Sequence, residues 1–234
     1  MILTIEKMVK AGVHFGHPKS EQNPRMSPFI YTEKNNIQII DIIQTYFYIK
    51  KTSRFLFESC SKGKRILFVG TNKYISRLIK KRANESDSWY VNKRWLGGLL
   101  TNWKTLQNSI IKLRELDWLE KKGYFSSLSK KETSHLKKKK NRLTKYFGGL
   151  KTMFNLPDII IIAGQLKELN AIRESKILNI TLITIVDTNC DPYLSDFFIP
   201  ANDDSITSLD LIFNEFIGAI KEGRKTFLKM KMLK

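Results

Sequence analysis

The stretch W-Y-V-N-K-R-W-L-G-G-L-L-T-N-W-K-T, residues 89–105, joins an apolar strand to the start of a long helical segment. Lys93 and Arg94 stand beside Trp95, so two cations and a flat aromatic ring follow the strand directly. Cations neutralise the phosphates of a nucleic acid, and aromatic rings stack on unpaired bases. Two interpretations follow: an RNA contact made by these three residues, or a core tryptophan beside a solvated basic pair.

The glycine pair 97–98 allows a sharp turn of the backbone before the helix. Thr101 and Asn102 are candidate N-cap residues for a helix that begins near Trp103. Asn102 and Lys104 extend the candidate RNA contact past the glycines. The whole stretch thus predicts a strand, a tight loop and a helix start that together present polar and basic groups.

Apolar runs on either side of this stretch predict the fold. They are R-I-L-F-V-G-T (65–71), D-I-I-I-I-A-G (158–164) and T-L-I-T-I-V-D-T (181–188), which are typical of buried parallel strands. A short strand is expected within 191–200, and helices are expected at 73–84, at 168–178 and from 203–205 onward, with a frayed basic tail. The alternation predicts an α/β fold: a flavodoxin-like parallel sheet in the order 2-1-3-4-5, with helices on both faces.

Residues 102–150 interrupt that alternation with an inserted α-helical hairpin. Apolar residues recur at coiled-coil spacing in both limbs, and Ser129 to Glu132 forms a capping box that opens the second limb. We expect the apolar seams of the two limbs to pack mainly against each other, so that the hairpin projects as an arm and is not part of the core. The predicted division is an α/β domain, 1–101 and 151–234, with an N-terminal extension and this insertion at 102–150. The seam residues are Leu106, Ile110, Leu113, Leu116, Leu119, Leu136, Leu143 and Leu150.

The N-terminal extension contains A-G-V-H-F-G-H-P, residues 11–18, which we expect to form a glycine-rich loop. His14 and His17 have the spacing of a metal pair, but only the distant His135 could complete a site. We therefore expect the two histidines to pack or to contact RNA. N-P-R-M-S-P-F-I-Y (23–31) predicts an extended segment or hairpin that presents Arg25, and I-Q-I-I (37–40) predicts a strand.

The charge balance points to a polyanionic partner. The 234 residues include 41 Lys and Arg against 22 acidic residues, giving a net charge of +19, while 42% of residues are hydrophobic, which is enough for a core. The second limb of the hairpin carries Lys137, Lys138, Lys139, Lys140 and Arg142, either as a solvated face or as an RNA contact. Nucleic acid is favoured over a membrane, because no apolar run approaches the length of a membrane span and no signal pattern is visible.

Enzyme chemistry is poorly supported. The loop 70–74 contains one glycine and no phosphate-binding pattern, and Cys60 and Cys190 lie far apart without metal-ligand spacing, as in a reducing compartment. Asp187, Asp203 and Asp204 are expected to cap or turn the backbone without catalysis, with a weak structural cation as the alternative. We expect no cofactor, no membrane and no small-molecule substrate. The alternative to an RNA-binding protein is a basic α/β enzyme that acts on nucleotides or RNA.

Several of these motifs together resemble the S2 family of bacterial-type small-subunit ribosomal proteins. They run through the chain in order: A-G-V-H-F-G-H-P, N-P-R-M-S-P-F-I, R-I-L-F-V-G-T, N-K-R-W-L-G-G-L-L-T-N-W-K-T, L-S-K-K-E, L-P-D, I-V-D-T-N-C-D-P and I-P-A-N-D-D. The family usually has Lys or Arg where this chain has Asn72.

The resemblance implies a structural protein without catalytic activity, bound to 16S rRNA and to neighbouring small-subunit proteins, on the solvent side between head and body. It implies the flavodoxin-like domain and the protruding hairpin. The motifs N-C-D-P and I-P-A-N-D-D are similar to those of the plastid-encoded form, and so is the high content of Ile, Lys and Asn. That form implies residence in ribosomes of the chloroplast stroma; the alternative is the bacterial cytoplasm.

Overall fold

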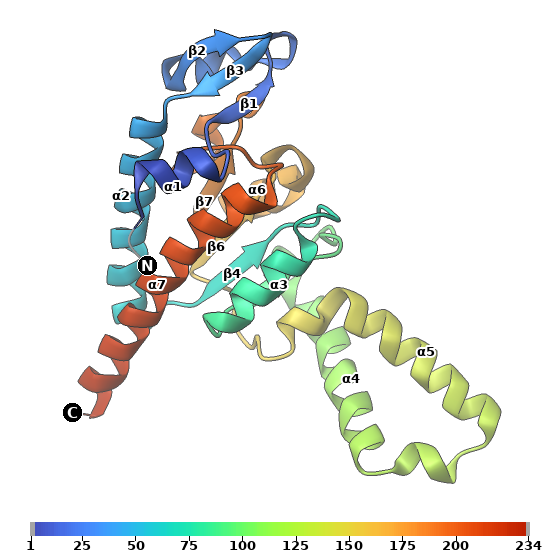
Figure 1. The fold of residues 1–234 in the computed structure, drawn as a ribbon. Coiled ribbons are helices and arrows are strands. Elements are labelled where there is room, and N and C mark those ends of the chain that lie inside the picture. Colours follow the sequence, from blue (N-terminus) through green and yellow to red (C-terminus); the bar gives the residue numbers. More distant parts are fainter. Residues whose placement is uncertain (1–2, 233–234) are drawn as a thin grey trace.

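A computed structural model describes residues 3–232 and contains the expected parallel sheet (Figure 1). Its five strands lie in the order β5-β4-β6-β7-β8, and all neighbours pair in parallel. In chain order this is the predicted 2-1-3-4-5 arrangement, so the flavodoxin-like fold is confirmed. The strands are β4 (Ile66–Val69), β5 (Trp89–Val91), β6 (Ile159–Ala163), β7 (Thr181–Val186) and β8 (Phe197–Pro200).

Helices cover both faces of the sheet, which explains why β4 and β6 are buried at every position. One face packs on α2 (Ile42–Ser61), α3 (Ser76–Glu85) and α7 (Ile206–Met232). The other face packs on α6 (Leu169–Ile177) and on the base of the inserted hairpin. Two short 3₁₀ turns, η5 (Gln165–Glu168) and η6 (Pro192–Leu194), lie at the ends of β6 and β7. Helix α3 begins at Ser76, three residues later than the sequence predicts.

The long helices α2 and α7 lie side by side (Figure 1). A Cβ atom at Gly223 would lie 2.5 Å from the backbone oxygen of Phe57 and 2.8 Å from Cβ of Cys60, so only glycine permits this approach. Helix α7 stays regular to Met232, and the expectation that the basic tail frays was wrong over the described residues. Contacts with α2 and the turn after it reach Gly223 and Phe227, and helix propagation carries the last residues.

The N-terminal segment begins with α1 (Ile5–Lys10), whose N-cap is Thr4. A separate antiparallel sheet follows, in the order β1-β3-β2, made of β1 (Phe15–Pro18), β2 (Ile30–Lys34) and β3 (Ile37–Ile40). Residues 11–18 were predicted as a loop, but their second half is β1, because it pairs with β3. Asn35 and Asn36 have φ angles of 53° and 62°, which suits the tight turn between β2 and β3. The 3₁₀ turns η1 (Lys19–Glu21) and η2 (Pro24–Phe29) connect β1 to β2.

The inserted hairpin consists of α4 (Trp103–Lys121), η3 (Tyr124–Ser127), α5 (Lys130–Phe147) and η4 (Gly148–Leu150). The predicted capping box at Ser129 and Glu132 is present. Figure 1 shows the far ends of α4 and α5 extending away from the sheet. The base of the hairpin, however, belongs to the core, contrary to our expectation. It contributes Ile110, Leu113, Phe147 and Leu150 to the same cluster as Leu67 and Ile160 of the sheet.

Candidate nucleic-acid interface

The loop that follows β5 is organised by one buried carboxylate from α6. Oε1 of Glu174 accepts hydrogen bonds from Nε1 of Trp95 at 2.9 Å and from the backbone N–H of Gly98 at 2.8 Å. Oε2 accepts from the backbone N–H of Leu100 at 2.8 Å and of Thr101 at 3.2 Å. One side chain therefore satisfies four donors of a loop that has few backbone partners of its own.

Burial by itself would raise the pKa of Glu174, but these hydrogen bonds outweigh it and lower the pKa below its ordinary value. Glu174 is thus held as a carboxylate in the core. The loop also turns at Gly98, whose φ of +80° suits glycine. Asn92 ties the start of the loop to α3 by donating to the backbone oxygen of Ser76 at 2.8 Å.

These contacts separate the three residues that the sequence placed together. Trp95 is 7% exposed, whereas Lys93 and Arg94 are exposed and form no ion pair with any residue in 3–232. The burial of Trp95 agrees with the alternative of a core tryptophan, so its indole is not offered to an RNA base. Asn102 and Lys104, at the other end of the loop, are exposed as well. Asn102 occupies the N-cap position of α4 without a capping hydrogen bond, which leaves its amide available.

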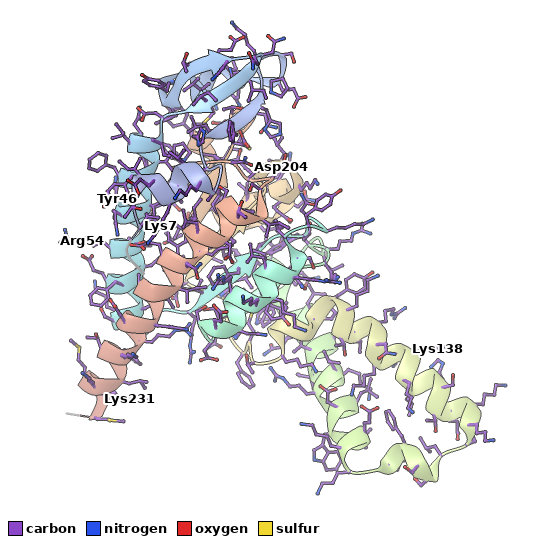
Figure 2. All side chains as sticks on the ribbon, viewed as in Figure 1. Lys7, Tyr46, Arg54, Lys138, Asp204 and Lys231 are labelled. Atoms are coloured by element: carbon purple, nitrogen blue, oxygen red, sulfur yellow. The ribbon has the colours of Figure 1, made fainter. Side chains whose placement is uncertain are left out.

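The four successive lysines 137–140 of α5 do not all point the same way, because successive side chains of a helix project in different directions. Lys140 points toward α4, where it forms ion pairs with Glu120 and, at 2.8 Å, with Asp117, and these contacts raise its pKa. Lys137, Lys138 and Lys139 point to solvent, as does Arg142, and none of them is in an ion pair within the described residues. Figure 2 shows Lys138 on the outward side of the hairpin. A shallow depression of about 370 Å³ is lined by His135, Lys138, Lys139 and Arg142.

The N-terminal candidates are held by acidic residues of the main domain. His17 lies with Nδ1 3.2 Å from Asp187 and Nε2 3.4 Å from Asp204, and its pKa is raised to about 9, first by the contact with Asp187. The Nδ1–H is not aligned for a hydrogen bond, so the contact is an ion pair. Arg25 forms an ion pair with Asp191. His17 and Arg25 are therefore neutralised within the protein.

His14 differs from its neighbour. Its ring lies 4.1 Å from that of Phe15, and burial lowers its pKa, so it is a packed neutral histidine. His17 and Arg25 thus fasten the N-terminal segment to the carboxyl edge of the large sheet. His14 thus follows the packing alternative, and the RNA contacts expected of His17 and Arg25 stay a prediction.

The three aspartates predicted as caps or a weak cation site surround His17. Asp187 is buried and accepts from the backbone N–H of Thr188 at 2.6 Å, and burial raises the pKa of Asp203 to about 7. The start of α7 is capped instead by Asn202, whose side chain accepts from the N–H groups of Asp204 and Ser205 at 3.0 Å each. Residues 3–232 contain no group of three or more His, Cys, Asp or Glu side chains that could hold a metal ion. The imidazole of His17 lies among these carboxylates, and the weak cation site stays a prediction.

Glu174 is the residue that sequence reasoning missed. The only signal was an acid on the inner face of α6, between Ala171 and Ser175, both of which are buried. A carboxylate on an apolar face implies a set of buried donors elsewhere in the chain. The sequence does not say which donors these are.

Comparisons with known proteins agree with the resemblance. The model of the family "Ribosomal protein S2" matches residues 8–223. Small ribosomal subunit protein uS2c of Oltmannsiellopsis viridis is 55% identical over 97% of this chain and 95% of that protein. The protein of the same name from Mesostigma viride is 46% identical over 94% and 97%, and uS2 of Synechococcus sp. (strain JA-2-3B'a(2-13)) is 46% identical over 95% and 84%.

Within residues 3–232, no helix has both the length and the apolar character needed to cross a membrane. The family match covers both sheets, the hairpin and the loop organised by Glu174. The family consists of structural ribosomal proteins, so this chain is not an enzyme. The chain belongs to the ribosomal protein S2 family.

Proposed function

We propose that this chain is a structural constituent of the small subunit of a plastid ribosome, where it binds 16S rRNA and neighbouring small-subunit proteins in the stroma. The names of the relatives from Oltmannsiellopsis viridis and Mesostigma viride support the small subunit as its location. The net charge of +19 supports RNA as the main partner.

One observation carries the proposal: the hairpin and the loop at its base expose several cations that form no ion pair within residues 3–232. Lys93, Arg94 and Lys104 are exposed there, together with Lys137–Lys139 and Arg142. The acids at the carboxyl edge of the sheet are instead satisfied by His17, Arg25 and backbone N–H groups. Figure 2 shows this separation: Lys138 lies on the hairpin, and Asp204 lies at the start of α7. Unpaired cations on one module suit a phosphate backbone.

The test is sedimentation with small subunits. The protein should migrate with the subunit through a high-salt wash. Its affinity for naked 16S rRNA should fall steeply as salt rises, because each neutralised phosphate releases counterions. A flat affinity between low and physiological salt would contradict the proposal. Arg54→Gln is a useful control, since Arg54 already pairs with Glu58 on α2.

A further inference from the structure

A cleft of about 470 Å³ opens at the amino edge of the sheet, beside the base of the hairpin. None of its residues belongs to the surface described above. Its volume falls within the range of about 300–1,000 Å³ that small-ligand sites occupy. The lining residues come from the starts of β4, β5 and β6 and from the loop after η4: Arg65, Asp87, Trp89, Thr152, Phe154, Asn155, Leu156 and Asp158.

Two aromatic rings in this lining are held in place. Nε1 of Trp89 donates to Oγ1 of Thr152 at 3.1 Å. The guanidinium of Arg114 lies 4.2 Å from the centre of the Phe154 ring. Arg114 is itself fixed, because it donates to the backbone oxygens of Lys151 at 2.6 Å and Met153 at 3.2 Å. Phe154 is nevertheless 62% exposed, so much of its ring surface remains accessible to a ligand.

Three polar side chains of the cleft have atoms without a partner among the described residues. Arg65 is exposed, and its guanidinium forms no ion pair with any described residue. The carboxylate of Asp158 uses Oδ2 to accept the backbone N–H of Arg65 at 2.7 Å, and no other described donor bonds to it. The side-chain amide of Asn155 likewise has no protein partner among residues 3–232. The cleft thus combines a free cation, a free acceptor and a free amide with aromatic surface.

We propose that this cleft binds one unpaired nucleotide of an RNA strand, and that the base carries an exocyclic amino group. This inference rests on the proposed function and adds a site to it. Unpaired bases stack on aromatic rings and present their edges to polar side chains. Phe154 supplies the stacking surface, and Arg65 faces the phosphate. Asp158 accepts from the amino group, as carboxylates do with N4 of cytosine. Uracil has no such donor.

The charges of the cleft favour a nucleotide over an acidic peptide. Asp87 and Asp158 repel the several carboxylates of an acidic peptide, whereas a nucleotide brings one phosphate, which Arg65 can meet, and a neutral base that can donate to the acids. An RNA strand reaching this cleft also runs beside a strongly basic chain, whose net charge is +19. A protein segment that contacts Phe154 is the competing outcome of the test.

The test uses the full-length protein and single-stranded oligoribonucleotides of about ten nucleotides, oligo(C) and oligo(U), at one fixed salt concentration. Phe154→Ala should weaken oligo(C) binding by roughly fivefold or more, since stacking is lost. Phe154→Leu keeps apolar bulk beneath Arg114 and should show the same loss. Tyr193→Ala is the matched control, because Tyr193 is 63% exposed at the opposite edge of the sheet.

The wild type should prefer oligo(C) to oligo(U), and Asp158→Asn should reduce that preference. Melting curves verify that each variant is folded.

Each outcome decides between the two proposals. Unchanged oligo(C) binding by both Phe154 variants, or equal binding of oligo(C) and oligo(U) by the wild type, would overturn the nucleotide site. Salt-dependent binding of 16S rRNA would still stand in that case. Loss of a neighbouring protein from subunits assembled with Phe154→Ala, with RNA binding intact, would assign the cleft to a protein and also overturn the proposal. Failure of the wild type to bind 16S rRNA would instead overturn the proposed function.

Discussion

Oε1 of Glu174 lies 2.9 Å from Nε1 of Trp95, so two residues separated by 79 positions fix the loop between β5 and α4. The same carboxylate accepts N–H groups of Gly98, Leu100 and Thr101. The loop that presents Lys93 and Arg94 is therefore held from inside the core, and its exposed cations need no ordering of their own backbone when they meet RNA.

Glu174→Gln should lower the free energy of unfolding by about 1–3 kcal/mol, because the new amide N–H₂ faces backbone donors and leaves some of them unpaired. The pKa of Glu174 is lowered in the folded protein, so its stabilisation is present above the unfolded value of 4.5 and is lost as the pH falls below it through the folded pKa. Denaturant melts over this range provide the measurement. Glu222→Gln, an exposed position of α7, is the control. Equal stability of Glu174→Gln and wild type would refute the role of the carboxylate.

Arg94→Glu should weaken association with the small subunit and leave the melting temperature unchanged, because Arg94 is exposed and has no ion pair within residues 3–232. Trp95→Ala should instead lower the stability of the free protein. It removes a buried indole, which should cost roughly 3–5 kcal/mol of the free energy of unfolding. Thermal melts and sedimentation of both variants separate the two roles. A large drop in melting temperature for Arg94→Glu would make it a structural residue.

Replacing Lys137, Lys138 and Lys139 with Gln should make the salt dependence of rRNA binding shallower, by up to about 0.7–0.9 in the log–log slope for each lost phosphate contact. Lys140→Gln is the matched control from the same run. It breaks ion pairs with Asp117 and Glu120, so it should loosen the hairpin and leave the slope nearly unchanged. Equal slopes for the triple variant and wild type would remove this face of α5 from the RNA surface.

His17→Gln should lower the melting temperature most at pH values below 6.5. The pKa of His17 is raised to about 9, so its stabilising ion pairs are fully present below 6.5 and are lost as the pH rises through about 9. The difference between wild type and variant should therefore shrink toward alkaline pH. His135→Gln, an exposed histidine of α5, should follow the wild type. A difference that stays constant from pH 6 to above 9 would contradict the assignment.

Replacing the whole hairpin, Trp103 to Leu150, with a Gly/Ser linker should destabilise the sheet domain, because the linker removes Ile110, Leu113, Phe147 and Leu150 from the core. Replacing only residues 119–139 should leave the domain near wild-type stability, since loop closure changes slowly with length. Circular dichroism melts compare the two proteins. Competitive incorporation into small subunits then measures anchoring. Normal incorporation of the shorter replacement, which lacks Lys137–Lys139, would show that the far part of the hairpin is not an anchor.

The sequence by itself determined the parallel sheet, its strand order, the inserted hairpin and the Ser129 capping box. The reason for the elements is local: continuous apolar runs such as 158–164 are typical of strands covered on both faces, and heptad spacing is typical of paired helices. The strand order follows from the alternation of strands and helices and the connection rules of parallel sheets. The excess of positive charge is also readable without a structure, and it indicates a polyanionic partner.

The tertiary structure decided which charges remain available. Neighbouring lysines 137–140 are equivalent in the sequence, but helix geometry turns Lys140 toward Asp117 and the other three toward solvent. Trp95 is buried and Arg94 is exposed because Glu174, which is distant in the chain, bonds to the indole. His17 meets Asp187 only after β1 docks beside the end of β7. Ion pairs and buried hydrogen bonds join residues whose separation in the chain carries no periodic signal, so packing alone selects them.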